Sequence, residues 1–142
     1  MFKNSNISSQ ITQNGFALLD ADIHKETSLL NDFIDSNFVI QSSSFYYSLL
    51  NNNYEKNTTL LNFIKKVLVS FYEKNFISYR TITESFLVKT ANTSEELSLH
   101  QDWCYTDERK YAAYNIWIPL TDVDEKNGAL CFLPGSHLWF NN

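Results

Sequence analysis

The chain has 142 residues, 44% of them hydrophobic and 15% aromatic, and its formal net charge is -5 at pH 7. This length and composition are typical of a globular protein that can bury a core, and we expect residues 1–142 to form a single domain. The negative charge offers no basic surface for a nucleic-acid backbone, and no apolar run approaches the roughly 20 residues that a membrane-spanning helix requires.

The N-terminal half is predicted to contain two amphipathic helices after a polar start. Residues 1–13 are expected to be frayed, and they lack the apolar core of a secretory signal, which favours the cytoplasm. A short strand is predicted over 15–19 and a helix over 25–35. Asn57 or Thr58 is expected to cap a longer second helix. The apolar stripe of that helix is Leu60, Leu61, Ile64, Val67, Leu68 and Phe71.

The rest of the chain is dominated by strand-like patterns. An extended segment is predicted over 45–50. From Phe76 the pattern has period two, which predicts strands over 76–81, with Ile77, Tyr79 and Thr81, and later around Phe86, Val88 and Thr90. A polar loop over 91–97 separates the later strands, and Asn127-Gly128 is a strong signal for a hairpin turn. The predicted strands cover residues 100–105, 111–120 and 129–133.

The strand predicted over 100–105 carries a candidate metal site. Residues two apart on a strand point to the same side, so His100 and Asp102 can offer a nitrogen and an oxygen to one metal while Gln101 points away. An iron(II) oxygenase needs a second histidine from elsewhere to complete a face of two histidines and one carboxylate. A hydrogen-bonded surface pair and a set that includes Cys104 are the alternatives.

The order of motifs along the C-terminal third resembles one enzyme family. These motifs are His100-Gln101-Asp102, the Trp-bearing segment Asn115 to Leu120, Asn127-Gly128, and Pro134-Gly135-Ser136-His137. In this order they resemble the phytanoyl-CoA dioxygenase family of oxygenases, which depend on iron(II) and 2-oxoglutarate. Towards the N-terminus the resemblance rests on layout, with residues 15–19 in the place of the strand that opens such domains.

The resemblance implies a fold and a set of site residues. The implied fold is α+β: a double-stranded β-helix (a cupin-like jelly roll) with supporting N-terminal helices. His100 and Asp102 would bind Fe(II), and Gln101 and Trp117 would line the site of the 2-oxoglutarate co-substrate. The histidine of the family's Pro-Gly-Ser-His turn is not an iron ligand, so His137 would not bind the metal. The implied activity is hydroxylation of a small organic substrate.

Members of the family continue beyond this turn, through strands that supply the distal histidine and an arginine for 2-oxoglutarate. We therefore expect the jelly roll to be incomplete at the C-terminus of the 142 residues. The alternative function is that of a truncated or split chain, catalytically incomplete, which acts only as a metal-binding or partner-binding fragment. Such a fragment would expose apolar surface and unpaired strand edges, and would self-associate or pair with a complementary C-terminal chain.

Overall fold

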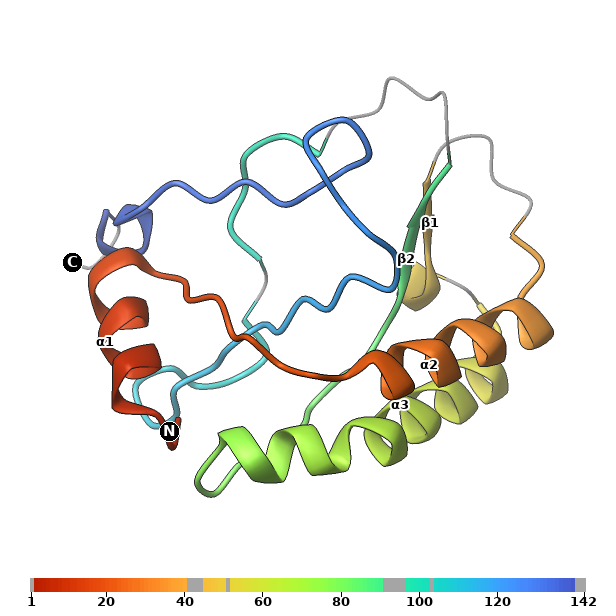
Figure 1. Cartoon of the computed structure of the whole chain (residues 1–142), viewed down its shortest axis with the longest axis horizontal. Coiled ribbons are helices and arrows are strands. Elements are labelled where there is room, and N and C mark those ends of the chain that lie inside the picture. Colours follow the sequence, from red (N-terminus) through yellow and green to blue (C-terminus); the bar gives the residue numbers. More distant parts are fainter. Residues whose placement is uncertain (1, 41–44, 51, 91–96, 103, 140–142) are drawn as a thin grey trace.

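The computed structural model describes residues 2–40, 45–50, 52–90, 97–102 and 104–139. Figure 1 shows two helices packed side by side near a small sheet, with a third helix at the opposite end of the molecule. The elements in chain order are α1 (Ser5–Asn14), α2 (His24–Asn37), β1 (Phe45–Tyr47), η1 (Ser48–Leu50), α3 (Tyr54–Asn75), β2 (Leu87–Lys89) and η2 (Ser136–Leu138).

Helix α1 replaces the frayed start that the polar sequence predicts, so that prediction is wrong. The Asn4 side chain accepts a hydrogen bond from the backbone N–H of Asn6 at 2.9 Å and caps the helix. Gly15 follows the last turn in the left-handed conformation, with φ 85°, and its N–H donates to the Ile11 carbonyl. Caps at both ends satisfy backbone groups that a short polar helix would otherwise leave open. Ile7 is buried and anchors the helix.

Helices α2 and α3 confirm the two predicted helices and carry most of the core. The α3 stripe is confirmed at Leu60, Ile64, Leu68 and Phe71, which are all buried. The predicted start of the helix is wrong, because Asn53 is the cap: its side chain accepts from the Lys56 N–H at 2.9 Å. An asparagine just before the first turn satisfies an otherwise unpaired N–H, and the helix therefore begins earlier than the apolar stripe does.

The sheet consists of β1 and β2, which run antiparallel with Tyr46 opposite Val88. Extended structure was expected over 45–50, but the strand ends at Tyr47 because Ser48 begins a 3-10 turn. The buried Ser48 hydroxyl accepts a hydrogen bond from the Phe86 N–H at 3.0 Å, and its own N–H donates to the Phe86 carbonyl. This exchange holds the start of β2 against the turn.

The other predicted strands are not formed in the part of the chain that the structure describes. No strand is assigned over 15–19, 76–81, 111–120 or 129–133, or over the described residues of 100–105, of which residue 103 lies outside the description. Residues 91–96 of the predicted polar loop also lie outside it. Alternating side chains give a segment two faces, but a strand also needs a hydrogen-bonding partner along its edge. The described fold is therefore α+β with one two-stranded sheet, and the jelly roll stays a prediction.

The described C-terminal third supplies no buried residue to the core but packs against it. The buried apolar residues are Phe2, Ile7, Leu30, Ile34, Phe38, Leu60, Ile64, Leu68, Phe71, Tyr72, Phe76 and Phe86. Ile118 and Leu120 pack against this cluster, and the Asn31 side chain donates to the Leu120 carbonyl at 2.8 Å. Nearer the N-terminus, Phe2 contacts the ring of Tyr114, with centroids 5.0 Å apart. These contacts fix the course of the segment from 114 to 120.

None of the helices in the described ranges combines the length and the apolarity needed to cross a membrane.

Candidate metal centre

The His100 imidazole is oriented by a hydrogen bond to the backbone. Its Nδ1 lies 2.6 Å from the carbonyl oxygen of Ser98, which can only accept a hydrogen bond. Nδ1 must therefore carry a proton. In the neutral ring this leaves a lone pair on Nε2, the tautomer that binds a metal through Nε2. A backbone contact two residues away thus decides which nitrogen is free.

The free nitrogen faces the carboxylate of Asp102. Nε2 of His100 lies 3.3 Å from Oδ1 of Asp102. Two lone pairs at this separation repel one another unless a cation, either a proton or a metal ion, lies between them. A charge-assisted N–H···O bond typically spans about 2.7–2.9 Å. Two ligand atoms about 2.1 Å from one metal, as in zinc sites, are roughly 3.0 Å apart at a right angle and roughly 3.4 Å apart at a tetrahedral angle. The separation of 3.3 Å lies within the range for two ligands of one metal ion, and a protonated His100 would form an ion pair with Asp102 at the same distance.

The second carboxylate oxygen of Asp102 has a different partner. The side-chain amide of Asn115 donates a hydrogen bond to Oδ2 at 2.7 Å. Oδ1 therefore faces His100 while Oδ2 faces Asn115. In the sequence, Asn115 is part of the Trp-bearing motif, and no role at the metal centre was predicted for it. Its position two residues before Trp117, on the same side of an extended segment, is the sequence feature that could have indicated one.

In the described ranges, no group of three His, Cys, Asp or Glu side chains is arranged to hold a metal ion. The alternative set with Cys104 is not formed, because the Cys104 thiol contacts Thr106 instead, with its sulfur 3.2 Å from Oγ1. His137 lies against α1, where its Nε2 is 3.1 Å from the Thr12 carbonyl oxygen. The chain thus brings two donors together, and the donor set matches two of the three ligands expected of an iron(II) face.

The site is open to solvent. The side chains of His100 and Asp102 are 50% and 61% exposed, so packing holds neither of them in place. Gln101 and Trp117, predicted to line the co-substrate site, are also exposed. Trp117 keeps 46% of its surface accessible, which leaves a flat aromatic face and an indole N–H free to contact a small molecule.

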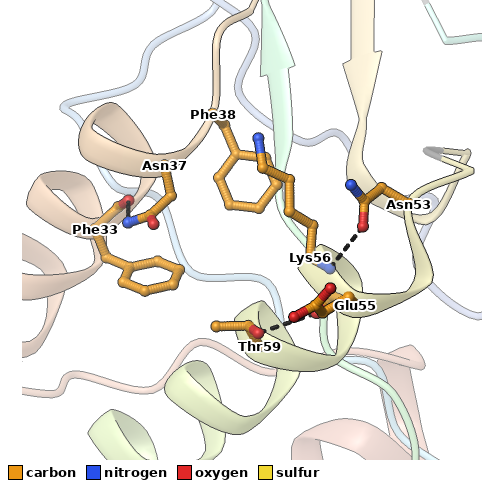
Figure 2. Close-up of a pocket in the computed structure, with 7 residues that line it drawn as sticks. All are labelled: Phe33, Asn37, Phe38, Asn53, Glu55, Lys56 and Thr59. Atoms are coloured by element: carbon orange, nitrogen blue, oxygen red, sulfur yellow. Dashed lines mark hydrogen bonds between the residues drawn. The ribbon is translucent and has the colours of Figure 1, made fainter.

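A separate cleft lies between the end of α2 and the start of α3. Its volume is about 180 Å³, and Figure 2 shows the residues that line it: Phe33, Asn37, Phe38, Asn53, Glu55, Lys56 and Thr59. The Lys56 ammonium lies 5.1 Å from the centre of the Phe38 ring. No residue of the segment that carries His100 and Asp102 lines this cleft. The cleft is therefore distinct from the candidate metal centre.

Two titratable groups on or beside α3, Tyr72 and Glu84, have pKa values shifted by burial. Burial raises the pKa of Glu84, and the Lys65 ammonium, 3.7 Å from Oε2, opposes that shift only in part. Burial, with the neighbouring Glu84 charge, raises the pKa of Tyr72 to about 12. Burial and a specific charge partner often mark a functional site, but ion pairs inside a fold perturb pKa values as well. Here Tyr72 lies on the buried face of α3 and Glu84 contacts Lys65 of the same helix, so we interpret both groups as structural.

Comparison with known families gives one match. The family model described as phytanoyl-CoA dioxygenase matches residues 17–142 of the chain. No curated protein and no solved structure has a significant match to the chain.

Proposed function

The chain belongs to the phytanoyl-CoA dioxygenase family, and on that premise we propose that it takes part in the Fe(II)- and 2-oxoglutarate-dependent hydroxylation of a small organic substrate. His100 and Asp102 are the proposed ligands of the iron. Gln101 and Trp117 are proposed to line the position of 2-oxoglutarate. The substrate is a small molecule whose identity is left open, because a fold hosts many substrates and the choice lies in the site.

One observation carries this proposal. His100 Nε2 and Asp102 Oδ1 are 3.3 Å apart, and the hydrogen bond from Nδ1 to Ser98 leaves Nε2 without a proton in the neutral ring. A nitrogen and a carboxylate oxygen at this spacing match the donors that a non-haem iron(II) centre uses. The family match and this local geometry support the same chemistry.

When bound, iron(II) would activate dioxygen, of which one oxygen atom goes to the substrate alcohol and the other to the succinate that is formed, with carbon dioxide, from 2-oxoglutarate. The chain's own part is to hold and orient. His100 and Asp102 would bind the metal from one side and leave the other positions open. The Trp117 indole offers a flat wall and one N–H donor beside an anionic co-substrate. A second histidine is needed to complete the iron(II) face. The described residues bring no third ligand to His100 and Asp102, and the proposal includes this additional ligand.

Anaerobic titration with Fe(II) tests metal binding. A separate assay in the presence of dioxygen for succinate release from 2-oxoglutarate tests the proposed activity. In a chain completed by a segment that supplies the second histidine, we expect one Fe(II) to bind, and His100→Ala and Asp102→Ala each to abolish that binding. His137→Ala is the matched control, since the His137 ring contacts the Thr12 carbonyl and should leave binding unchanged. Absence of Fe(II) binding, or equal loss in all three variants, would refute the assignment.

A second candidate function is metal or partner binding without turnover. It is favoured by apolar side chains that are exposed along the C-terminal third, namely Tyr111, Ile116, Trp117, Leu130, Phe132, Leu133, Leu138 and Trp139. An exposed apolar surface of this kind is common at protein contacts. Bound Fe(II) without succinate release, together with a concentration-dependent mass in sedimentation experiments, would favour this function over the first.

A further inference from the structure

We propose that Asn115 is the positioning residue of the metal centre, and that it makes Asp102 bind the metal through Oδ1 alone. This inference rests on the proposed function, since it concerns the same two ligands. The Asn115 amide donates to Asp102 Oδ2 at 2.7 Å, which is within the range of a strong hydrogen bond to a charged acceptor.

The need for such a residue follows from the exposure of Asp102. Its side chain is 61% exposed, so packing does not restrict rotation of the carboxylate. The hydrogen bond from Asn115 is the contact that distinguishes the two oxygens. It occupies Oδ2 and turns Oδ1 towards His100 Nε2, 3.3 Å away. A rotated carboxylate would instead present both oxygens to the metal and occupy a position that a co-substrate needs.

The two ligands are held in parallel ways. Ser98 accepts from His100 Nδ1 at 2.6 Å and fixes the imidazole, while Asn115 donates to Asp102 and fixes the carboxylate. Hydrogen bonds of this outer kind set the orientation of metal ligands, and their loss typically weakens metal binding by about 10–100-fold. Asn115 differs from Ser98 in that a side chain makes the bond, so substitution can remove it.

The test compares Asn115→Leu with the same completed chain without that substitution, using Co(II) as a spectroscopic substitute for iron. Leucine has the same branched arrangement of side-chain heavy atoms as asparagine but donates no hydrogen bond. We expect Asn115→Leu to bind Co(II) about 10–100-fold more weakly, and the visible absorption bands of the bound ion to shift as the carboxylate rotates. Asn62→Leu is the matched control, because Asn62 is an exposed asparagine on α3, away from the centre.

Two further variants separate positioning from a general structural role. Asn115→Gln keeps the amide donor and should bind Co(II) with an affinity between those of the leucine variant and the unchanged chain. In an Asp102→Ala background, which is expected to bind no metal, Asn115→Leu should leave the urea unfolding midpoint unchanged, since the residue acts through that carboxylate.

The outcomes are distinguishable. If the unchanged chain binds Co(II) and Asn115→Leu binds it equally well with the same absorption bands, this inference is overturned while the proposed function stands. If the unchanged chain binds neither Co(II) nor Fe(II), the proposed function fails and this inference fails with it.

Discussion

Replacement of Gly15 by alanine tests how the C-terminal third is attached to α1. Gly15 has φ +85°, and an added Cβ would lie 2.6 Å from Nδ1 of His137. Real Cβ atoms do not approach other atoms so closely, so the imidazole has to move. That movement would break the contact of 3.1 Å between His137 Nε2 and the Thr12 carbonyl.

Gly135 provides a matched control for the backbone conformation. It has φ +78°, and in the described structure an added Cβ would meet no atom within 4 Å. A left-handed residue with a Cβ costs about 1–2 kcal/mol, and the stiffer unfolded chain offsets about 0.4–1 kcal/mol of this. We therefore expect Gly135→Ala to cost about 1 kcal/mol. Gly15→Ala should cost about 2 kcal/mol, because it also loses a hydrogen bond worth about 0.5–1.5 kcal/mol.

Urea unfolding followed by circular dichroism measures both free energies from the midpoints, provided that the slope is unchanged. The double variant Gly15→Ala/His137→Ala removes the ring that causes the collision. It should therefore be more stable than the sum of the two single changes predicts, by about 1 kcal/mol. If Gly15→Ala costs no more than Gly135→Ala, or if the double variant is simply additive, the proposed contact does not hold the C-terminal segment on α1.

Other changes address the core, the sheet and the buried carboxyl. Because burial raises the pKa of Glu84 above its ordinary value of 4.5, its contribution to stability is full below pH 4.5 and is lost as the pH rises through the folded pKa. Glu84→Gln should therefore match the unchanged chain in urea midpoint at pH 4 and exceed it at pH 7.5, and a lower midpoint at pH 7.5 would contradict this reasoning. Leu60 is 1% exposed, so Leu60→Ala should cost about 2–5 kcal/mol by calorimetry. Leu50 is 76% exposed, and Leu50→Ala should change stability by less than about 0.5 kcal/mol; equal losses would place the core elsewhere. Ser48→Ala leaves the Phe86 N–H without its partner and should cost about 1–3 kcal/mol. Faster hydrogen exchange at Phe86 checks this prediction, and unchanged exchange would contradict it.

At the candidate centre, the sequence indicated that His100 and Asp102 lie together, but it did not indicate which other residues orient their side chains. The predicted strand would place His100 and Asp102 on one side; the described residues there form no strand, yet His100 Nε2 and Asp102 Oδ1 lie 3.3 Å apart. The role of Asn115 required knowledge that a residue thirteen positions later returns to the same carboxylate. Nothing local to Asp102 specifies that partner, because it depends on how the segment after residue 110 is routed.

The sequence by itself determined the helices α2 and α3, because a helix depends on the pattern of residues that are close together in the chain. The apolar stripes of α2 and α3 repeat every three to four residues, so each helix and its buried face follow from local spacing. The motif order from His100 to His137 likewise indicates the family, which the family match over residues 17–142 confirms.

Only the tertiary structure decided which alternating segments pair as strands. Residues 45–47 and 87–89 form the sheet, whereas 111–120 has a similar alternation and forms no strand. A strand is completed by hydrogen bonds to a neighbour that is distant in the chain, and side-chain alternation carries no information about that neighbour. For the same reason the attachment of His137 to α1 became visible only in three dimensions, since it joins atoms 125 residues apart.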